Sequence, residues 1–283
     1  MSGTLLITGA SGYLGRELAR QAHAAGWQVI GTFRRAPLPL AGIQWQQLDV
    51  RDRDAVAGCV AAIRPDAIVH TAITEPNDWA TNADGAAHVA LAARQHHARL
   101  VHVSSDAIFS GASGLYDEDA MPEPITPYGA AKAAAETAVK ALLPSAAIVR
   151  TSLIIGAQPY KHVRMVLDML TGKRSDALFS DEIRCPVFVG NLAAAVLELT
   201  DHDYGGVLNV AGTEALSRYA LGRLIARRWG YDPARLRAIS TVESGLRRPT
   251  DVRLDVRRAQ ALLRTPLQGA TQFIDALTID DSA

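Results

Sequence analysis

Short apolar runs alternate with longer amphipathic stretches over the first 150 residues of this chain. The short runs, most of which contain β-branched residues, predict strands at residues 5–8, 29–32, 45–48, 67–70, 100–104 and 147–150. Between them, apolar residues recur every three or four positions, as in Leu14, Leu18 and Ala22, which is the period of a helix with one buried face. Strands that alternate with helices in this way form βαβ units. The pattern therefore predicts an α/β fold built on a doubly wound parallel sheet.

The alternation loosens after residue 150. Helices are predicted near residues 162–170, 192–199 and 219–229, and a strand at 207–210. Ser217 is placed to cap the last of these helices, and Gly230 is placed to end it. We predict a larger domain formed by residues 1–154 plus about 186–212, and a smaller, partly interleaved C-terminal lobe formed by about 155–185 plus 213–283.

Composition and charge exclude several classes of partner. The chain has 283 residues, 48% of them hydrophobic, which is enough for a full core. Its 29 basic and 29 acidic residues cancel, so we expect no nucleic-acid partner and no anionic membrane partner. No apolar stretch has the length of a membrane span and no cleavable leader is visible, which predicts a cytoplasmic location. Cys59 and Cys185 lack metal-ligand spacing and the eight histidines are dispersed, so we predict no metal site and a buried thiol at Cys59.

A glycine-rich turn follows the first predicted strand and opens the first predicted helix. Glycine allows a sharp turn and a close approach of the backbone to a pyrophosphate, and the free N–H groups of the helix start supply donors and partial positive charge. Such a turn is typical of a Rossmann-type domain that binds a dinucleotide. The residues of this segment that we expect to contact the cofactor are Thr8, Gly9, Ser11, Gly12, Tyr13, Leu14 and Gly15.

The end of the second predicted strand indicates which nicotinamide cofactor is bound. An acidic side chain there would accept a hydrogen bond from the adenosine ribose, whereas basic side chains pair with a 2′-phosphate. Here the strand runs into Arg34 and Arg35, with no carboxylate close by in the sequence. Because arginine forms charge-assisted hydrogen bonds to phosphate, we predict a preference for NADP(H) over NAD(H).

Tyr128 and Lys132 are four residues apart on a predicted helix and therefore lie on one face of it. A phenol has an ordinary pKa of about 10, which a nearby ammonium and an oxidised nicotinamide ring would lower. Ser105 is the candidate to hydrogen-bond a substrate carbonyl oxygen, with the adjacent Ser104 as the alternative. Together the residues predict reduction of a carbonyl group, with Tyr128 as the proton donor.

These segments resemble the extended short-chain dehydrogenase/reductases, in the dTDP-4-dehydrorhamnose reductase-like branch. Residues 8–15 are similar to the opening of that branch, and residues 103–109 are similar to its Ser-Thr-Asp-Tyr-Val-Phe segment, apart from Ala107 at the aromatic position. The resemblance implies an NAD(P)-dependent oxidoreductase and identifies Ser105 as the catalytic hydroxyl. It also implies that Asn82 helps to position Lys132 through water. Further cofactor contacts implied by the resemblance are Asp49, Val50, Thr71, Ala72, Ser104, Arg150 and Ser152.

The substrate side of the site is expected to bind an anion. Arg184, Arg247 and Arg248 are candidates because a guanidinium fork suits a diphosphate, and Asp106 is expected beside the substrate. We therefore expect NADPH-dependent reduction of a small-molecule keto substrate, either a nucleotide-activated 4-keto sugar or a related keto metabolite.

Two other interpretations of the function stay open. A homodimer is also possible as the oligomeric state. One interpretation is a non-catalytic NADP-binding regulatory subunit, which would not require Ser105, Tyr128 and Lys132 together. The other is an NAD-dependent sugar-nucleotide epimerase or dehydratase. The resemblance argues against it, because Asp106 is not followed by a second acidic residue and no acidic ribose contact ends the second strand.

Overall fold

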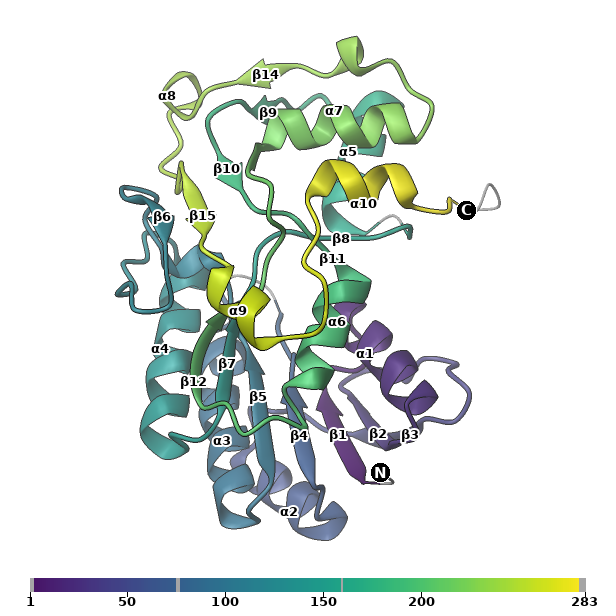
Figure 1. The fold of residues 1–283 in the computed structure, drawn as a ribbon, viewed down its shortest axis with the longest axis vertical. Helices are drawn as coiled ribbons and strands as arrows, with labels where there is room; N and C mark the ends of the chain where they lie inside the picture. Colours follow the sequence, from purple (N-terminus) through teal and green to yellow (C-terminus); the bar gives the residue numbers. More distant parts are fainter. Residues whose placement is uncertain (1–2, 75–76, 159, 280–283) are drawn as a thin grey trace.

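The computed structural model describes residues 3–74, 77–158 and 160–279 of the chain. Its centre is a seven-stranded sheet in the order β12-β7-β5-β4-β1-β2-β3, with every pair of neighbours parallel (Figure 1). The strands are β1 (Thr4–Thr8), β2 (Gln28–Phe33), β3 (Gln44–Gln47), β4 (Ala67–His70), β5 (Arg99–Val103), β7 (Ala147–Arg150) and β12 (Gly206–Asn209). Each strand predicted from the sequence is present within one residue of its expected bounds. The strand order runs outward from β1 in both directions, so the predicted doubly wound sheet is confirmed.

Helices cover both faces of the sheet. On one face lie α1 (Tyr13–Ala24) and α6 (Val189–Glu198), and on the other lie α2 (Arg53–Ile63), α3 (Gly85–Gln95) and α4 (Pro127–Leu142). Side chains alternate along a strand, so Leu5 and Ile7 of β1 join the core beneath α1 while Leu6 joins the core beneath α2 and α3. Both faces being buried explains why the strands read as continuous apolar runs.

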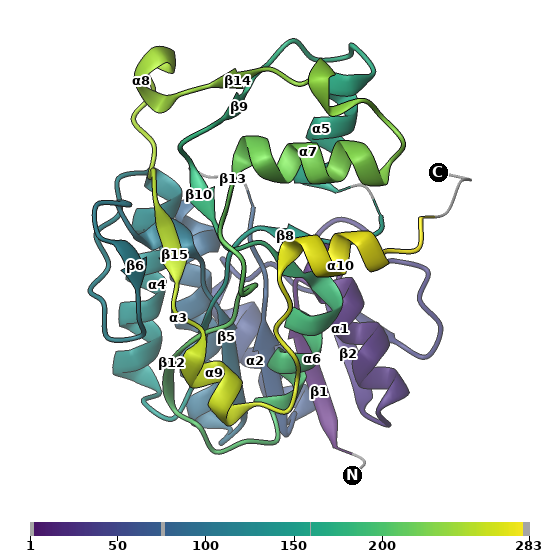
Figure 2. The same cartoon turned by 45° about the horizontal axis from the view of Figure 1, so that its top comes forward.

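A smaller lobe sits over the carboxyl ends of the strands (Figures 1 and 2). Its own core is formed mainly by α5, α7 and α10, with Leu170, Ile225 and Phe273 among the buried side chains. The elements of this part are α5 (Lys161–Leu170), β9 (Leu178–Phe179), β10 (Ile183–Arg184), β13 (Leu216–Ser217), α7 (Arg218–Arg228), η3 (Pro233–Arg235), β14 (Ala238–Ile239), α8 (Thr241–Ser244) and α10 (Ala270–Ala276). Ser217 caps α7 through the N–H of Ala220, as the sequence predicts.

Several short elements tie the two parts together. They are β6 (Gly114–Tyr116), β8 (Ile154–Ile155), β11 (Val187–Phe188), β15 (Val252–Leu254), α9 (Arg257–Leu262), the short helix η2 (Asp106–Ile108) and the π-helix η1 (Ala80–Asp84). The strand β15 pairs with β6, and β11 pairs with β8. Val252, Leu254 and Ala259, which the sequence places in the smaller lobe, join the core of the larger domain. The predicted division places all of residues 213–283 in the smaller lobe. In the structure, part of this segment packs on the larger domain instead.

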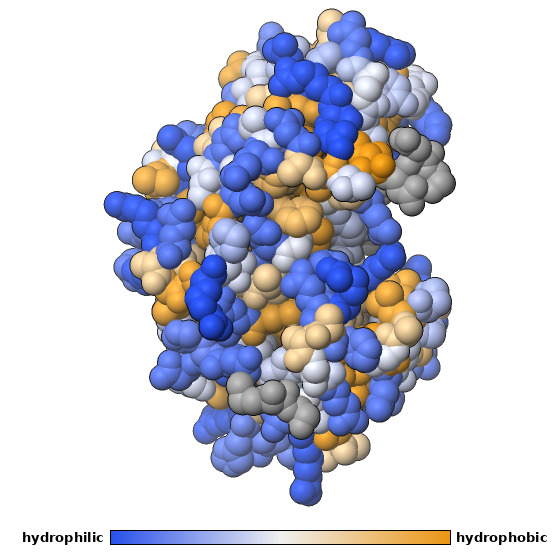
Figure 3. Space-filling model, turned by 45° about the vertical axis from the view of Figure 1, so that its right-hand side comes forward, coloured by the Kyte–Doolittle hydropathy of each residue, from blue (hydrophilic) through white to orange (hydrophobic). Residues whose placement is uncertain are grey.

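The surface and the cysteines complete the description. The face drawn in Figure 3 is mostly hydrophilic, with apolar side chains in small groups, and its outline is notched between the two lobes. Across residues 3–279, outside the gaps noted above, no helix is long and apolar enough to cross a bilayer. Cys185 is buried, but Cys59 on α2 is only partly buried, because this side of α2 lies at the edge of the sheet beyond β3.

Candidate active site

One large cavity lies between the carboxyl edge of the sheet and the smaller lobe. Its volume is about 900 Å³, and residues of both lobes line it. Every cofactor-binding, catalytic and substrate residue predicted from the sequence lines this cavity, with five exceptions. The exceptions are Thr8, Asn82, Lys132, Arg150 and Arg247. The structure therefore brings most of the predicted site together around one cavity. The five exceptions do not line this cavity.

The glycine turn forms one end of the cavity. Gly9 has a φ of +75°, and a Cβ there would lie 2.7 Å from the backbone nitrogen of Ala72. A Cβ at Gly15 would collide with the carbonyl oxygen of Gly9, so only glycine lets α1 start this close to the turn. No side chain caps the start of α1, and its first turn carries no acidic residue. The turn therefore leaves N–H donors and a positive helix end for an anion, which fits the pyrophosphate of a dinucleotide.

The end of β2 brings Arg34 and Arg35 to the cavity wall, near Asp49 after β3. The Asp49 carboxylate is engaged by Arg51, whose Nη2 lies 2.5 Å from Asp49 Oδ2. The Arg51 hydrogen bond lowers the pKa of Asp49, and the charge of Arg34 adds to that effect. The sequence shows no carboxylate beside the two arginines, but the fold places this one near Arg34. The Asp49 carboxylate is paired with Arg51, so Arg34 and Arg35 are available to a ligand.

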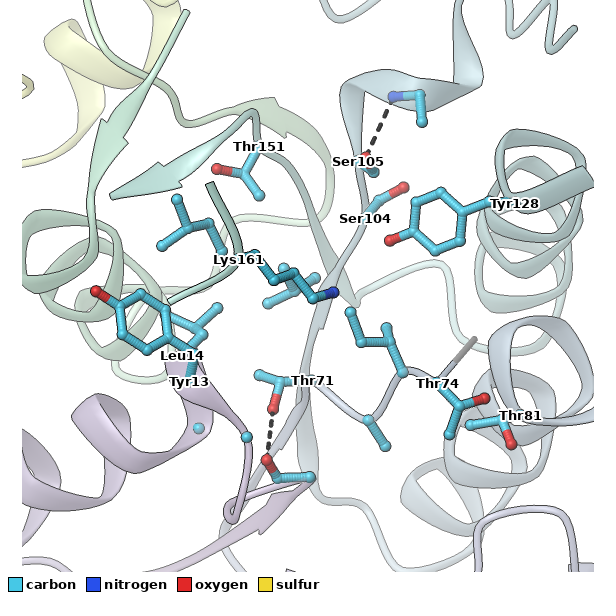
Figure 4. A pocket seen from close by; sticks show the side chains of 18 of the residues that line it. Tyr13, Leu14, Thr71, Thr74, Thr81, Ser104, Ser105, Tyr128, Thr151 and Lys161 are labelled. Carbon is cyan, nitrogen blue, oxygen red and sulfur yellow. Dashed lines mark hydrogen bonds between the residues drawn. The ribbon is translucent and has the colours of Figure 1, made fainter. Parts of the chain in front are cut away.

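The two hydroxyl groups predicted to be catalytic meet where α4 begins. The helix is capped by Thr126 and starts at Pro127, which has no N–H to leave unpaired. A Cβ at Gly129 would collide with the carbonyl oxygen of Ala107, so glycine allows α4 to pack directly on η2. This close packing brings Tyr128 next to Ser105, and the Tyr128 hydroxyl points into the cavity (Figure 4).

The structure distinguishes the two adjacent serines. The Ser104 hydroxyl donates to the buried carboxylate of Glu136 at 2.6 Å. The Ser105 hydroxyl interacts instead with Asp106 Oδ1 at 3.3 Å and with Tyr128. Burial and the charge of Asp106 raise the pKa of Tyr128 to about 12, while the Ser105 hydrogen bond opposes the rise. In this arrangement Tyr128 carries its proton at neutral pH, as a proton donor must.

Lys132 lies one turn along α4 from Tyr128 but beneath the cavity wall, with 2% exposure. Its Nζ donates to the carbonyl oxygen of Val103 at 2.7 Å and lies 3.3 Å from His102 Nε2. Burial lowers the pKa of Lys132 to about 8. Lys132 is not among the groups that shift the pKa of Tyr128 in this structure. Burial, Asp106 and Ser105 dominate the pKa of Tyr128 here, and the effect of the ammonium on the phenol stays a prediction.

Arg150 does not reach the cavity, although the resemblance implies a cofactor contact. Its guanidinium is 1% exposed and lies 2.9 Å from Glu136 Oε2, with further hydrogen bonds to the carbonyl oxygens of Glu118 and Ala120. It also lies over the ring of Phe109, at 5.1 Å from the centroid. The last residue of a buried strand points into a core layer here, so Arg150 joins the sheet to α4 instead of binding the cofactor.

Thr8 and Asn82 also lie behind the cavity wall. The Thr8 side chain is buried against His70, with Thr8 Oγ1 2.6 Å from His70 Nδ1. Asn82 is buried on η1, which packs against α4, and its Oδ1 accepts a hydrogen bond from the N–H of Thr74. Both residues support the walls from behind, and neither touches the open space directly.

The substrate end of the cavity contains a dense ionic cluster. The Arg184 guanidinium donates to the carbonyl oxygens of Ile183, Pro249 and Thr250, and its Nε lies 3.7 Å from Asp106 Oδ2. These bonds commit Arg184 to the protein, which weakens its expected role as an anion clamp. Burial raises the pKa of Asp106, against the opposing effects of Arg184, Ser152 and Ser105.

Arg218 is the residue of this cluster that sequence reasoning missed. Arg248 takes both oxygens of Glu182, at 2.8 and 3.3 Å, whereas Arg218 Nε is 3.8 Å from Glu182. Arg218 Nη1 is buried and has no hydrogen-bond partner among the described residues. Three arginines thus face two carboxylates here, and the surplus positive charge is on Arg218. The sequence offered no signal for it beyond a basic residue at a helix start.

Several further residues of the smaller lobe reach the cavity without being predicted, among them Lys161 and Tyr160. The Lys161 side chain extends into the middle of the cavity, between the glycine turn and the catalytic hydroxyls (Figure 4). Tyr160 stacks on Tyr13, with ring centroids 4.5 Å apart. Both lie where α5 begins, and the place of this helix depends on distant packing, so the sequence alone does not reveal them.

Among the described residues, no group of three or more histidine, cysteine, aspartate or glutamate side chains lies close enough together to hold a metal ion.

Comparison with known proteins agrees with this geometry. The family model described as "RmlD substrate binding domain" matches residues 3–278. A dTDP-4-dehydrorhamnose reductase of Mycobacterium tuberculosis is 33% identical over 260 residues, covering 84% of this chain and 80% of that protein. A dTDP-4-keto-6-deoxy-D-glucose reductase of Streptomyces niveus is 31% identical over 301 residues, covering all of both chains.

A solved structure shares the fold over nearly the whole chain. The dTDP-4-dehydrorhamnose reductase of Bacillus anthracis, in complex with NADP, has a TM-score of 0.82 and 25% identity, and the match covers 98% of each chain. The glycine turn, the paired hydroxyls and these matches lead to one assignment. The chain belongs to the RmlD substrate binding domain family and is an NAD(P)-dependent oxidoreductase of the extended short-chain dehydrogenase/reductase type.

Proposed function

We propose that this protein reduces the keto group of a nucleotide-activated 4-keto sugar, with NADPH as the reductant. The observation that carries the proposal is the convergence of Ser105 and Tyr128 in the same cavity as the glycine turn. The names of the relatives, which are dTDP-4-keto sugar reductases, support the substrate class.

The chemistry follows from the positions of the side chains. NADPH, held at the glycine turn, would supply a hydride for the carbonyl carbon. Ser105 hydrogen-bonds the carbonyl oxygen and orients it, and Tyr128 donates its proton to that oxygen as negative charge develops there. The C=O group becomes a secondary alcohol, and the Tyr128 phenolate regains a proton from solvent after the reaction. The raised pKa of Tyr128 supports the direction of this transfer, because the phenol is protonated before the substrate arrives.

Two features of the cavity support NADPH and an anionic substrate. Arg34 and Arg35 line the cavity at the end of β2, where a 2′-phosphate would lie, and Asp49 is neutralised by Arg51. At the opposite end, Arg218 adds positive charge that Glu182 does not balance. A diphosphate would supply the missing acceptor oxygens.

The decisive experiment compares turnover of wild-type protein and Tyr128→Phe with NADPH and a dTDP-4-keto-6-deoxy sugar, followed by the loss of NADPH absorbance. We expect kcat to fall by about 100- to 10,000-fold, because general acid catalysis is removed. The Kd for NADPH should stay unchanged. Tyr231→Phe, which alters a tyrosine outside the cavity, serves as the matched control. Wild-type turnover by Tyr128→Phe would remove the proposed proton donor, and an inactive wild-type protein would remove the substrate class.

A further inference from the structure

A row of polar side chains crosses the face of the sheet that α3 and α4 cover. Thr8 lies opposite His70 in the register of β1 and β4, and His70 lies opposite His102 in the register of β4 and β5. All three residues are buried, at 1%, 2% and 0% exposure. Thr8 Oγ1 lies 2.6 Å from His70 Nδ1, and the two imidazole rings stack with centroids 5.3 Å apart. The row connects the residue before the glycine turn to the interior beneath the cavity.

Lys132 meets the end of this row from α4. Its Nζ donates to the carbonyl oxygen of Val103 at 2.7 Å and lies 3.3 Å from His102 Nε2. An ammonium group has donors only, so His102 Nε2 must be the acceptor and its ring proton must lie on Nδ1. Two acceptors therefore orient the ammonium, one from the backbone of β5 and one from a side chain.

The groups around Lys132 keep both histidines neutral. Burial lowers the pKa of His70 to about 3 and the pKa of His102 well below its ordinary value, and the charge of Lys132 acts in the same direction. On α4, Glu136 favours the charged form of Lys132, while Arg150 of β7 pairs with Glu136 at 2.9 Å. Of the other elements packed on α4, η1 contributes the uncharged Asn82 and η2 contributes the buried Asp106, whose carboxyl group faces Ser152 and Arg184. His102 is therefore available as an acceptor throughout the neutral range.

The other nitrogen of His102 shows that the ring is not there for stability alone. His102 Nδ1 is buried and has no hydrogen-bond partner among the described residues. A buried donor without an acceptor is destabilising, and an apolar ring of similar size would avoid that penalty. The arrangement is explained if Nε2 serves Lys132.

We propose that His102 is a positioning residue whose Nε2 holds the Lys132 ammonium at the floor of the cavity, with His70 and Thr8 keeping the His102 ring in place. Nζ has three N–H groups, and two are directed to Val103 and His102, which leaves one for a further acceptor. The importance of this contact for catalysis rests on the proposed function, but the contact itself does not depend on any substrate.

The test measures the protonation of Lys132 directly. The chain has four lysines, and the other three, Lys140, Lys161 and Lys173, are exposed. In protein with ¹³C-labelled lysine, the buried residue is assigned by replacing the three exposed lysines with arginine one at a time. NMR titration then gives the midpoint of Lys132. His102→Phe removes the acceptor but keeps the ring, so the charged form loses a stabilising contact and the midpoint should fall by about one unit.

Two amide variants of different length, His102→Gln and His102→Asn, provide a second test that does not depend on whether His102→Phe folds. In His102→Gln the amide oxygen reaches the place of Nε2, so the Lys132 midpoint should stay near its wild-type value. In His102→Asn the shorter side chain cannot reach Nζ, so the midpoint should fall as in His102→Phe. His88→Gln is the matched control, because His88 contacts the carbonyl oxygen of Val50 and does not contact a lysine. Wild-type midpoints in both His102→Asn and His102→Phe would overturn the proposal.

The pH dependence of turnover distinguishes the contact between His102 and Lys132 from the proposed catalytic function. If Lys132 works in catalysis, the alkaline limb of the kcat/KM profile should move to lower pH in His102→Asn and return in His102→Gln. A shifted Lys132 titration with an unshifted profile would support the contact and argue against a role of Lys132 in the reaction. An unshifted titration would reject the contact, whether or not the enzyme reduces the sugar.

Discussion

Arg150 provides the sharpest test of the structure, because the resemblance implies a cofactor contact and the fold gives it a structural role. We consider the substitution Arg150→Met, which keeps much of the length of the side chain and removes its charge. In the wild-type protein the guanidinium bonds Glu136 through Nε and Nη2, and both side chains are 1% exposed. The substitution leaves the Glu136 carboxylate buried, with the Ser104 hydroxyl as its hydrogen-bond donor and with Lys140 at 4.0 Å and the charge of Lys132 nearby.

The expected loss of stability is large. Removing one partner of a buried ion pair costs about 3–5 kcal/mol. The carbonyl oxygens of Glu118 and Ala120 lose their donor as well, which adds up to about 1 kcal/mol each. We therefore expect the free energy of unfolding to fall by about 4–6 kcal/mol, a large part of the roughly 5–15 kcal/mol typical of a domain. The loss should shrink at lower pH, because an unpaired buried Glu136 binds a proton more readily.

The assay is urea unfolding followed by circular dichroism, together with the Kd for NADPH. Arg94→Met, at an exposed position of α3, is the control and should change stability by less than about 0.5 kcal/mol. The double variant Arg150→Met/Glu136→Met should recover much of the loss, since no unpaired charge remains. The reasoning is refuted if Arg150→Met unfolds within about 1 kcal/mol of the wild type while its Kd for NADPH rises about tenfold.

Three further predictions follow from the packing and charges. In Gly129→Ala the new Cβ collides with a backbone oxygen of η2, so we expect kcat to fall about 100-fold, while Gly58→Ala on α2 has open space and should keep wild-type turnover. Because the pKa of His70 falls from 6.5 to about 3 on folding, the unfolded state binds more protons between these values and stability is lost as pH falls through this window. His70→Gln should flatten the plot of unfolding free energy against pH by up to about 1.4 kcal/mol per unit, and an unchanged slope would contradict the assignment. Arg218→Gln should weaken the binding of a nucleoside diphosphate by about 10- to 100-fold in calorimetry, with exposed Arg223→Gln as the control, and equal affinities would remove Arg218 from the substrate site.

The predicted strands were confirmed because their evidence is local. Six of the seven strands of the sheet are buried on both faces, so an apolar run bounded by turns identifies them without knowledge of their neighbours, whereas the edge strand β3 carries three exposed glutamines. The residues predicted to be catalytic could be grouped from the sequence for a related reason. Tyr128 and Lys132 lie four residues apart on one helix, and the glycines follow one strand, so short segments specify each group.

The errors concern residues whose direction depends on distant parts of the chain. Arg150 ends a strand next to residues that line the cavity, but its own side chain points to Glu136 on α4. Cys59 lies on the expected helix, yet its exposure depends on where the sheet ends. Arg218 is 34 positions after Arg184, and no spacing in the sequence indicates that both approach Glu182. In each case the deciding partner is remote in sequence.

By itself, the sequence determined the fold class and pointed to the glycine turn and the pair of hydroxyl groups that line the cavity, because each is encoded within a few residues by periodicity, glycine geometry or helix spacing. Only the tertiary structure decided which charges face the cavity and which pair inside the protein. It committed Arg150 to Glu136 and Arg184 to backbone oxygens, left Arg218 with an unbalanced charge, and placed Lys132 against His102. The physical reason is that the energy of a charge depends on its burial and its nearest partners, and both are set by segments that meet only when the chain folds.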